Sequence, residues 1–267
     1  MRKYLAILRI RFINALQYRI SAFATTATRF AWGFLEVTIF LAFYRVSPAD
    51  FPMEISHTVA YLWMQQAFLP LFRVQFYESE IYSAIIDGSI AYEMVRPMDL
   101  YTRWCCQAAA NRLAQTLIRC VLILFFSFWL PEPYRMTPPP DLPQFGLFIL
   151  SSALSMMVAV TFCMLVYISM FYTLSPGGVR QLATFVSDLL TGATIPLPFF
   201  PGPLRKLLEL LPFGSMQNMP LRIYSGNIHG ADAVTGIALQ FFWVMILLYA
   251  GHAAMNRALR RVVTQGG

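Results

Sequence analysis

The sequence predicts an all-α fold, that of a polytopic membrane protein with six transmembrane helices. Three observations lead to this class: hydrophobic residues make up 58% of the 267 residues, charged residues only 12%, and long apolar runs recur along the chain. A typical soluble globular protein has about 25% charged residues, so this chain has too few to coat a soluble surface. A soluble enzyme, a disordered protein and a secreted disulfide scaffold all fit poorly, whereas a bundle of helices in lipid fits well.

The order of the elements follows from the apolar runs, because a membrane helix needs about 20 mostly apolar residues. Residues 1–20 predict an amphipathic interfacial helix, since apolar residues recur there at helical spacing and arginines occupy much of the remaining surface. A simple first helix of the bundle is the alternative for this segment. Residues 21–256 predict a single transmembrane domain, and 257–267 a cytoplasmic tail. The expected spans are 22–44, 57–76, 108–130, 145–173, 181–200 and 233–254.

The orientation follows from the lysines and arginines of the segments between spans, because cytoplasmic loops carry the excess of them. With the N-terminus inside, twelve basic residues fall on the inner side: Arg2, Lys3, Arg9, Arg11, Arg19, Arg73, Arg96, Arg103, Arg180, Arg257, Arg260 and Arg261. Only five fall on the outer side: Arg45, Arg135, Arg205, Lys206 and Arg222. We therefore expect a multi-pass protein of the cytoplasmic membrane with both termini in the cytoplasm. The arginines also interrupt the first 20 residues, so we expect no cleavable signal peptide.

The residues offer little support for chemistry within this chain. The net charge of +7 does not indicate nucleic acid, because the chain has only two lysines and its arginines are scattered among apolar runs. Neither lysine lies in a glycine-rich phosphate loop, the sequence has no His-Glu-x-x-His zinc motif, and its aspartates are isolated. The four cysteines lack metal-ligand spacing and are expected to be packing residues. We therefore expect no catalytic residue, no metal and no cofactor bound by this chain.

Four charges within the expected spans are functional candidates, because a buried charge in lipid costs several kcal/mol unless it is paired or hydrated. They are Arg29, Glu36, Arg119 and Asp188. One interpretation is a polar conduit or gate built from Arg119 with Asp188 or Glu36. The other is an arginine that extends to the inner membrane surface, together with a static ion pair that fixes the helix register.

The polar stretch 77–103 predicts two short helices. The first runs from Glu78 to Ile86 and ends at Asp87-Gly88, and the second runs from Ser89 to Val95 and ends before Pro97. A helix pair this short and mixed in polarity suits neither lipid nor independent folding. It predicts a docking surface for a soluble partner, with an inert surface loop as the alternative.

The stretch 191–213 predicts a break in the fifth span. Proline and glycine interrupt it, and the segment LRKLLELL then forms one amphipathic helix between two further prolines. A broken helix at membrane depth is tolerated only where protein or a cavity covers its backbone, which predicts a re-entrant hairpin at the outer face. A proline-rich outer loop is the alternative. The residues that define the hairpin are Gly192, Pro196, Pro198, Pro201 and Pro212.

These two stretches resemble those of the ABC-2 type permeases, the membrane subunits of one class of ATP-binding-cassette (ABC) exporter. DGSIAYEMVRPMDL resembles the Gly-x-Ile/Leu-…-Leu-x-x-Pro pattern of their loop between spans two and three, with Met94 at the usual leucine. GATIPLPFFPGPLRKLLELLPF resembles their Gly-x-x-x-Pro-…-Phe-Pro-…-Leu-Pro-Phe signature after span five. The greatest likeness is to a bacterial group of about this length, described as uncharacterised transport-system permeases.

The resemblance implies a function. The chain would pair with a second permease, as a homodimer or heterodimer, and with two ABC ATPase subunits that bind ATP and magnesium. The loop between spans two and three would enter a cleft of the ATPase as a coupling helix, and the substrate path would be lined mainly by spans one, two and five. Implied coupling residues are Glu80, Ile85, Asp87, Gly88, Glu93, Arg96 and Pro97. A bacterial inner membrane is the implied location.

Two functions from different classes remain at this point. The first is a transport subunit, most simply of an exporter, driven by a separate ATPase. The second is a non-transporting membrane assembly or sensor protein that recruits a soluble partner through residues 77–103.

Overall fold

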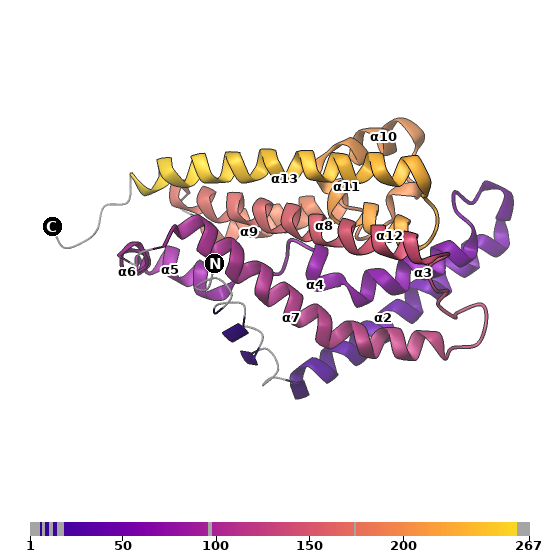
Figure 1. Ribbon diagram of the computed structural model, residues 1–267. Helices are drawn as coiled ribbons and strands as arrows, with labels where there is room; N and C mark the ends of the chain where they lie inside the picture. Colours follow the sequence, from indigo (N-terminus) through magenta and orange to yellow (C-terminus); the bar gives the residue numbers. More distant parts are fainter. Residues whose placement is uncertain are drawn as a thin grey trace.

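The computed structural model describes residues 6, 9–10, 13–14, 19–95, 98–173 and 175–260, and the regular structure within these ranges is entirely helical (Figure 1). The all-α prediction is therefore confirmed. The amphipathic helix expected over 1–20 lies almost wholly outside the described residues, and so does most of the tail 257–267.

The helices of the described ranges vary widely in length. Long helices are α2 (Arg19–Val46), α7 (Leu100–Phe128), α8 (Leu142–Ser169), α9 (Pro176–Leu190) and α13 (Gly230–Leu259). Shorter ones are α3 (Ile55–Ala67), α4 (Leu69–Phe72), α5 (Ser79–Ile86), α6 (Ile90–Met94), α10 (Gly202–Leu210), α11 (Pro212–Met216) and α12 (Asn218–Tyr224). Single 3₁₀ turns occur at Pro48–Asp50, Met170–Tyr172 and Leu197–Phe199.

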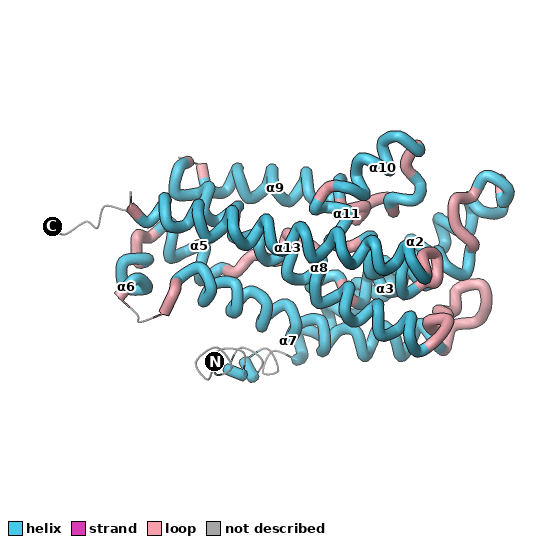
Figure 2. Tube along the Cα trace, turned by 45° about the horizontal axis from the view of Figure 1, so that its top comes forward, coloured by secondary structure: helices cyan, strands magenta, loops and turns pink. Residues whose placement is uncertain are grey.

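The long elements lie roughly side by side and alternate in direction (Figures 1 and 2). The α5–α6 pair and the last turn of α13 lie at one end of the bundle, whereas α10 and α11 lie at the other. Helix α8 packs along α13 and α12, and α3 packs between α2 and α7. We call the two ends of the bundle the α5–α6 end and the α10–α12 end.

Three helical segments are long and apolar enough to cross a membrane: Leu100–Phe128, Leu142–Tyr172 and Gly230–Leu259. They expose large apolar side chains at helical spacing, such as Leu117, Val121 and Phe125 of α7. Such a face suits lipid, where no polar coat is needed. Helix α2 has the length of a span at 28 residues, but it carries Arg29 and Glu36 and is not one of the three.

The segment 57–76, expected as one helix, is divided. Helix α3 ends at Ala67 and α4 continues from Leu69 to Phe72, with Pro70 in its first turn. Proline has no N–H to donate to the carbonyl four residues earlier, so α3 cannot continue through this position. Every residue of α3 from Thr58 to Ala67 is buried, which places this helix at the centre of the bundle rather than in contact with lipid.

The segment 181–200 also differs from a continuous helix. Helix α9 begins at Pro176 and ends at Leu190, and Gly192 follows with a φ of 78°. The Ala193 N–H donates to the Asp188 carbonyl at 3.1 Å, which closes the turn that commonly ends a helix at a glycine. A Cβ at Gly192 would lie 2.9 Å from the Leu197 nitrogen, so both space and conformation require glycine here.

A buried polar network joins α8, α11 and α13. The Gln240 amide donates to Ser155 Oγ at 2.7 Å and to the Ser215 carbonyl at 2.9 Å, and it accepts from Ser151 Oγ at 2.9 Å. Both hydrogen-bonding ends of this fully buried amide are thereby satisfied, as an apolar interior requires. The network fixes the position of α11, and with it the segment that follows α9.

Candidate functional site

The α5–α6 pair begins and ends close to the predicted residues. Helix α5 runs from Ser79 to Ile86 and is followed by Gly88, whose φ of 72° reverses the chain into α6. Helix α6 ends at Met94, one residue before the expected boundary. The predicted coupling residues Arg96 and Pro97 lie outside the described residues.

Three glutamates of this segment, Glu78, Glu80 and Glu93, bind one face of α7. The carboxylate of Glu80 accepts from the Gln107 amide at 3.0 Å, and that of Glu93 accepts from the Trp104 indole at 2.8 Å. Two further contacts complete the series: Arg103 with Glu93, and Asn111 with Glu78. Three of the α7 partners, Trp104, Gln107 and Asn111, recur every three or four residues and thus form one stripe, and Arg103 lies next to Trp104. The α5–α6 pair is therefore fastened to α7 by charge-assisted hydrogen bonds.

The pair also exposes four large apolar side chains. Tyr92 is 81% exposed and Val95 84% exposed. Met94, between them, and Ile86, at the end of α5, are each at least two-fifths exposed. We call these four residues the α6 face. Scattered exposed hydrophobic residues are ordinary, but four within ten residues on a well-anchored projection indicate a contact surface.

Arg112 anchors the chain just before α5. Its guanidinium is almost fully buried and donates to the carbonyls of Pro70 at 3.0 Å, Arg73 at 2.7 Å and Phe76 at 3.2 Å, and to Cys163 Sγ at 3.2 Å. The carbonyls at the end of α4 would otherwise lack partners, and a cation is favourable at a helix C-terminus. Arg112 thus fixes the irregular segment from α4 to α5.

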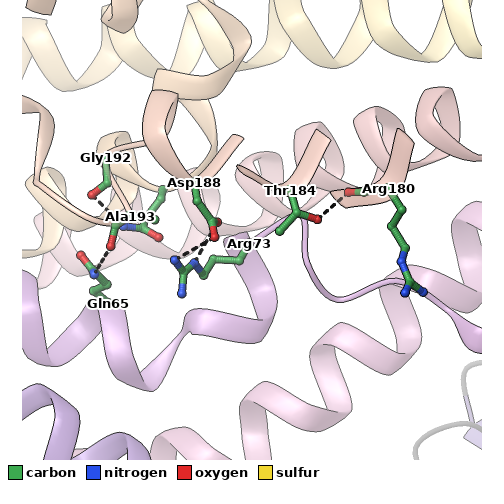
Figure 3. Close-up of polar contacts among 8 residues, drawn as sticks. Gln65, Arg73, Arg180, Thr184, Asp188, Gly192 and Ala193 are labelled. Atoms are coloured by element: carbon green, nitrogen blue, oxygen red, sulfur yellow. Dashed lines mark hydrogen bonds and ion pairs between the residues drawn. The ribbon is translucent and has the colours of Figure 1, made fainter. Parts of the chain in front are cut away.

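Arg73 and Asp188 form a bidentate ion pair (Figure 3). The Nε–Oδ1 and Nη2–Oδ2 distances are both 3.2 Å, and both side chains are mostly buried. Nearby, the Gln65 amide donates to the Ala193 carbonyl at 3.0 Å. The pair joins the segment before α5 to the last turn of α9 and thus connects the α5–α6 pair to the start of the segment that follows α9.

Three further charges were expected within spans: Arg29, Glu36 and Arg119. Asp188 pairs with Arg73 and not with Arg119, whose guanidinium lies 5.8 Å from the centroid of the Phe76 ring. Glu36 accepts from the Gln66 amide at 2.9 Å, and Arg29 acts on Glu36 and Asp188 only at longer range. Of the two interpretations of these charges, the conduit or gate would place Arg119 beside Asp188 or Glu36, whereas in the structure Asp188 pairs with Arg73 and Glu36 accepts from Gln66.

The segment after α9 is folded back onto the bundle. Pro196 and Pro198 are buried, Pro201 is exposed at the start of α10, and Pro212 begins α11. Glu209 of α10 accepts from Arg222 of α12 at 2.6 Å, which ties the two helices together. Burial lowers the pKa of the Arg222 guanidinium, and the Glu209 carboxylate opposes that shift.

A protein-family model described as ABC-2 family transporter protein matches residues 53–266. The chain belongs to the ABC-2 transporter family. It is thus a membrane protein and a permease of the ABC transporter class, a class whose members associate with ABC ATPase subunits, and the resemblance drawn from its motifs is confirmed. No curated protein matches the chain by sequence.

For this ABC-2 permease, the sequence predicted the two short helices of residues 77–103 but not the large apolar side chains that they expose. Glu80 and Glu93 turn toward α7, whereas Asp87 and Gly88 are exposed at the turn and Ile85 is half-buried. The sequence analysis did not identify the α6 face. A signal for it was present, because the run IAYEMV has apolar residues on both sides of a helix that is too short to bury them all. Arg112 was also missed as an anchor.

Proposed function

We propose that this chain is the membrane-spanning subunit of an ABC exporter and that a separate ATPase docks on the α6 face. The observation that carries the proposal is the combination at the α5–α6 end: four large apolar side chains are exposed on a pair of helices whose glutamates are fastened to α7. A rigid projection transmits force, whereas a loop without such anchors would absorb it.

The proposal extends to the architecture. The six alternating elements α2, α3–α4, α7, α8, α9 and α13 act as the six spans, and the segment 191–213 acts as the re-entrant hairpin. The α5–α6 end lies in the cytoplasm with both termini, in keeping with the excess of basic residues there. The membrane is the bacterial inner membrane.

The proposed complex contains this permease, a second permease of like fold and two ATPase subunits. ATP and magnesium bind to the ATPase subunits, and this chain catalyses no reaction of its own. Closure of the ATPases would move α5, and the Arg73–Asp188 pair would carry that movement to α9 and the hairpin. The permeases would expose the substrate path to the outer side in response.

The test is affinity purification of the tagged chain in mild detergent, with mass spectrometry and an assay of vanadate-sensitive ATP hydrolysis. The wild-type chain is expected to retain a P-loop subunit. The double variant Tyr92→Ser/Val95→Ser is expected to lose most of it, since a loss of about 1.4 kcal/mol lowers affinity roughly tenfold.

The matched control is Leu142→Ser, because Leu142 is as exposed as Tyr92 but starts α8 at the α10–α12 end. Retention of the ATPase by the control and its loss by the double variant support the proposal. A folded wild-type chain that retains no P-loop subunit and shows no hydrolysis would favour the assembly or sensor function instead.

A further inference from the structure

A pocket of about 310 Å³ opens between α2 and the segment that follows α9. Glu36 lies in its wall, Phe40 and Phe43 follow one and two turns further along α2, and Phe51 and Phe199 close it from the neighbouring loops. Its volume is at the lower end of the range of about 300–1,000 Å³ for small-molecule pockets.

A second pocket of about 590 Å³ shares Phe43, Phe51 and Phe199 with the first. It extends toward the loop between α2 and α3 and contains Asp50. The two pockets therefore adjoin one another, and the lining of each includes one acidic residue. We call the two pockets together the aromatic cleft.

The charge of the aromatic cleft is opposite to that of the chain. The residues that line it include Glu36 and Asp50, but no lysine, arginine or histidine of the described ranges, although the chain carries a formal charge of +7. Glu36 takes part in none of the ion pairs of the described residues, and its hydrogen-bond partner Gln66 is neutral. Its charge is thus not neutralised by direct contact.

The rings of the aromatic cleft are held against one another at close range. The centroid of Phe199 lies 4.9 Å from that of Phe40 and 5.0 Å from that of Phe51, both in edge-to-face geometry. Tyr44 contacts Phe51 in the same way at 5.2 Å. Aromatic faces attract cations, the more so where water is scarce. An anion would meet two carboxylates, and the described residues that line the cleft include no positive group.

We infer that the aromatic cleft binds a lipophilic organic cation, a quaternary ammonium or phosphonium centre with aryl or alkyl substituents. The rings contact the substituents, and Glu36 and Asp50 attract the charge. The inference names the class of substrate, and in that respect it rests on the proposed transport function. It places the site at the α10–α12 end, beside the hairpin that the Arg73–Asp188 pair connects to α5.

The test is equilibrium binding of tetraphenylphosphonium to the purified full-length chain in lipid nanodiscs without ATP. Tetraphenylborate, which has the same shape and the opposite charge, is the matched probe. Saturable binding of the cation alone is expected. Glu36→Gln keeps the acceptor oxygen for Gln66 but removes the charge, and it is expected to raise the Kd about tenfold, which is 1.4 kcal/mol.

Two further variants keep the test decisive if Glu36→Gln fails to fold. Asp50 is exposed between α2 and α3, and Asp50→Asn is expected to weaken binding of the cation. Glu132 is an exposed acid outside the cleft, and Glu132→Gln is expected to leave the Kd of the cation unchanged. Equal binding of the two probes, or an unchanged Kd in both Glu36→Gln and Asp50→Asn, would overturn the inference. Because no ATPase takes part in this assay, its failure is distinct from a failure of ATPase co-purification.

Discussion

At the scale of the residue, a substitution at Gly88 tests the role of the α5–α6 turn in transport without a large effect on folding. The φ of 72° at Gly88 lies in the left-handed region, and nothing lies within 4 Å of a Cβ built there. Gly88→Ala therefore costs only backbone strain, about 1–2 kcal/mol. We expect the variant to insert and fold, with a small loss of thermal stability, but to show reduced ATP-dependent transport because α6 is turned relative to α5.

Gly230 provides the matched control for this prediction. It also has a positive φ, of 57°, and also has open space around it, but it starts α13 at the α10–α12 end. Gly230→Ala should lose similar stability and keep its transport. Equal transport by the two variants, measured in proteoliposomes with the ATPase, would show that the turn at Gly88 has no role in coupling.

Single residues also mark where sequence reasoning succeeds and where it stops. The Asp87-Gly88 stop and the break at Gly192 follow from local chemistry, because glycine adopts the left-handed conformation at little cost. The role of Arg112 does not follow, since its carbonyl acceptors lie about forty residues away in sequence and meet it only in the folded bundle. The same holds for Arg73, which lies near the end of the expected span 57–76 and pairs with Asp188.

At the scale of the element, the Arg73–Asp188 pair is the connection between the segment before α5 and the end of α9. Arg73→Ala and Asp188→Ala should each lower the rate of vanadate-sensitive ATP hydrolysis that accompanies transport. Since the two residues act through one contact, the double variant should be little worse than either single one, with a coupling energy of about 0.5–3 kcal/mol in thermal unfolding. The exchanged pair Arg73→Asp/Asp188→Arg should recover part of the loss.

The ion pair of Arg205 with Glu209, within α10, is the control for this cycle. Its arginine lies four residues before its glutamate on one helix, a pair worth only about 0.3–0.5 kcal/mol. Arg205→Ala should therefore leave coupling unchanged. Strictly additive effects of Arg73→Ala and Asp188→Ala, with no recovery on exchange, would contradict a role for this pair in transmission.

At the scale of the whole molecule, composition predicted a helical membrane protein. The apolar runs located α2, α7, α8 and α13, and most of the ends of these helices lie within a few residues of the expected positions. The two exceptions, α3–α4 and α9, have physical causes in Pro70 and Gly192. Hydropathy could not reveal that α3 is enclosed by protein, because a segment buried in a bundle and one facing lipid are equally apolar.

The most direct test of the central claim is photocrosslinking in native membranes. One variant carries a photoreactive phenylalanine analogue in place of Tyr92 of the α6 face, and a second variant carries it in place of Leu142 at the α10–α12 end. The two positions are equally exposed. We expect the Tyr92 position to form an adduct with a P-loop ATPase subunit and the Leu142 position to form none. An adduct with the ATPase from Leu142, or none from Tyr92 while the ATPase still co-purifies, would contradict docking on the α6 face.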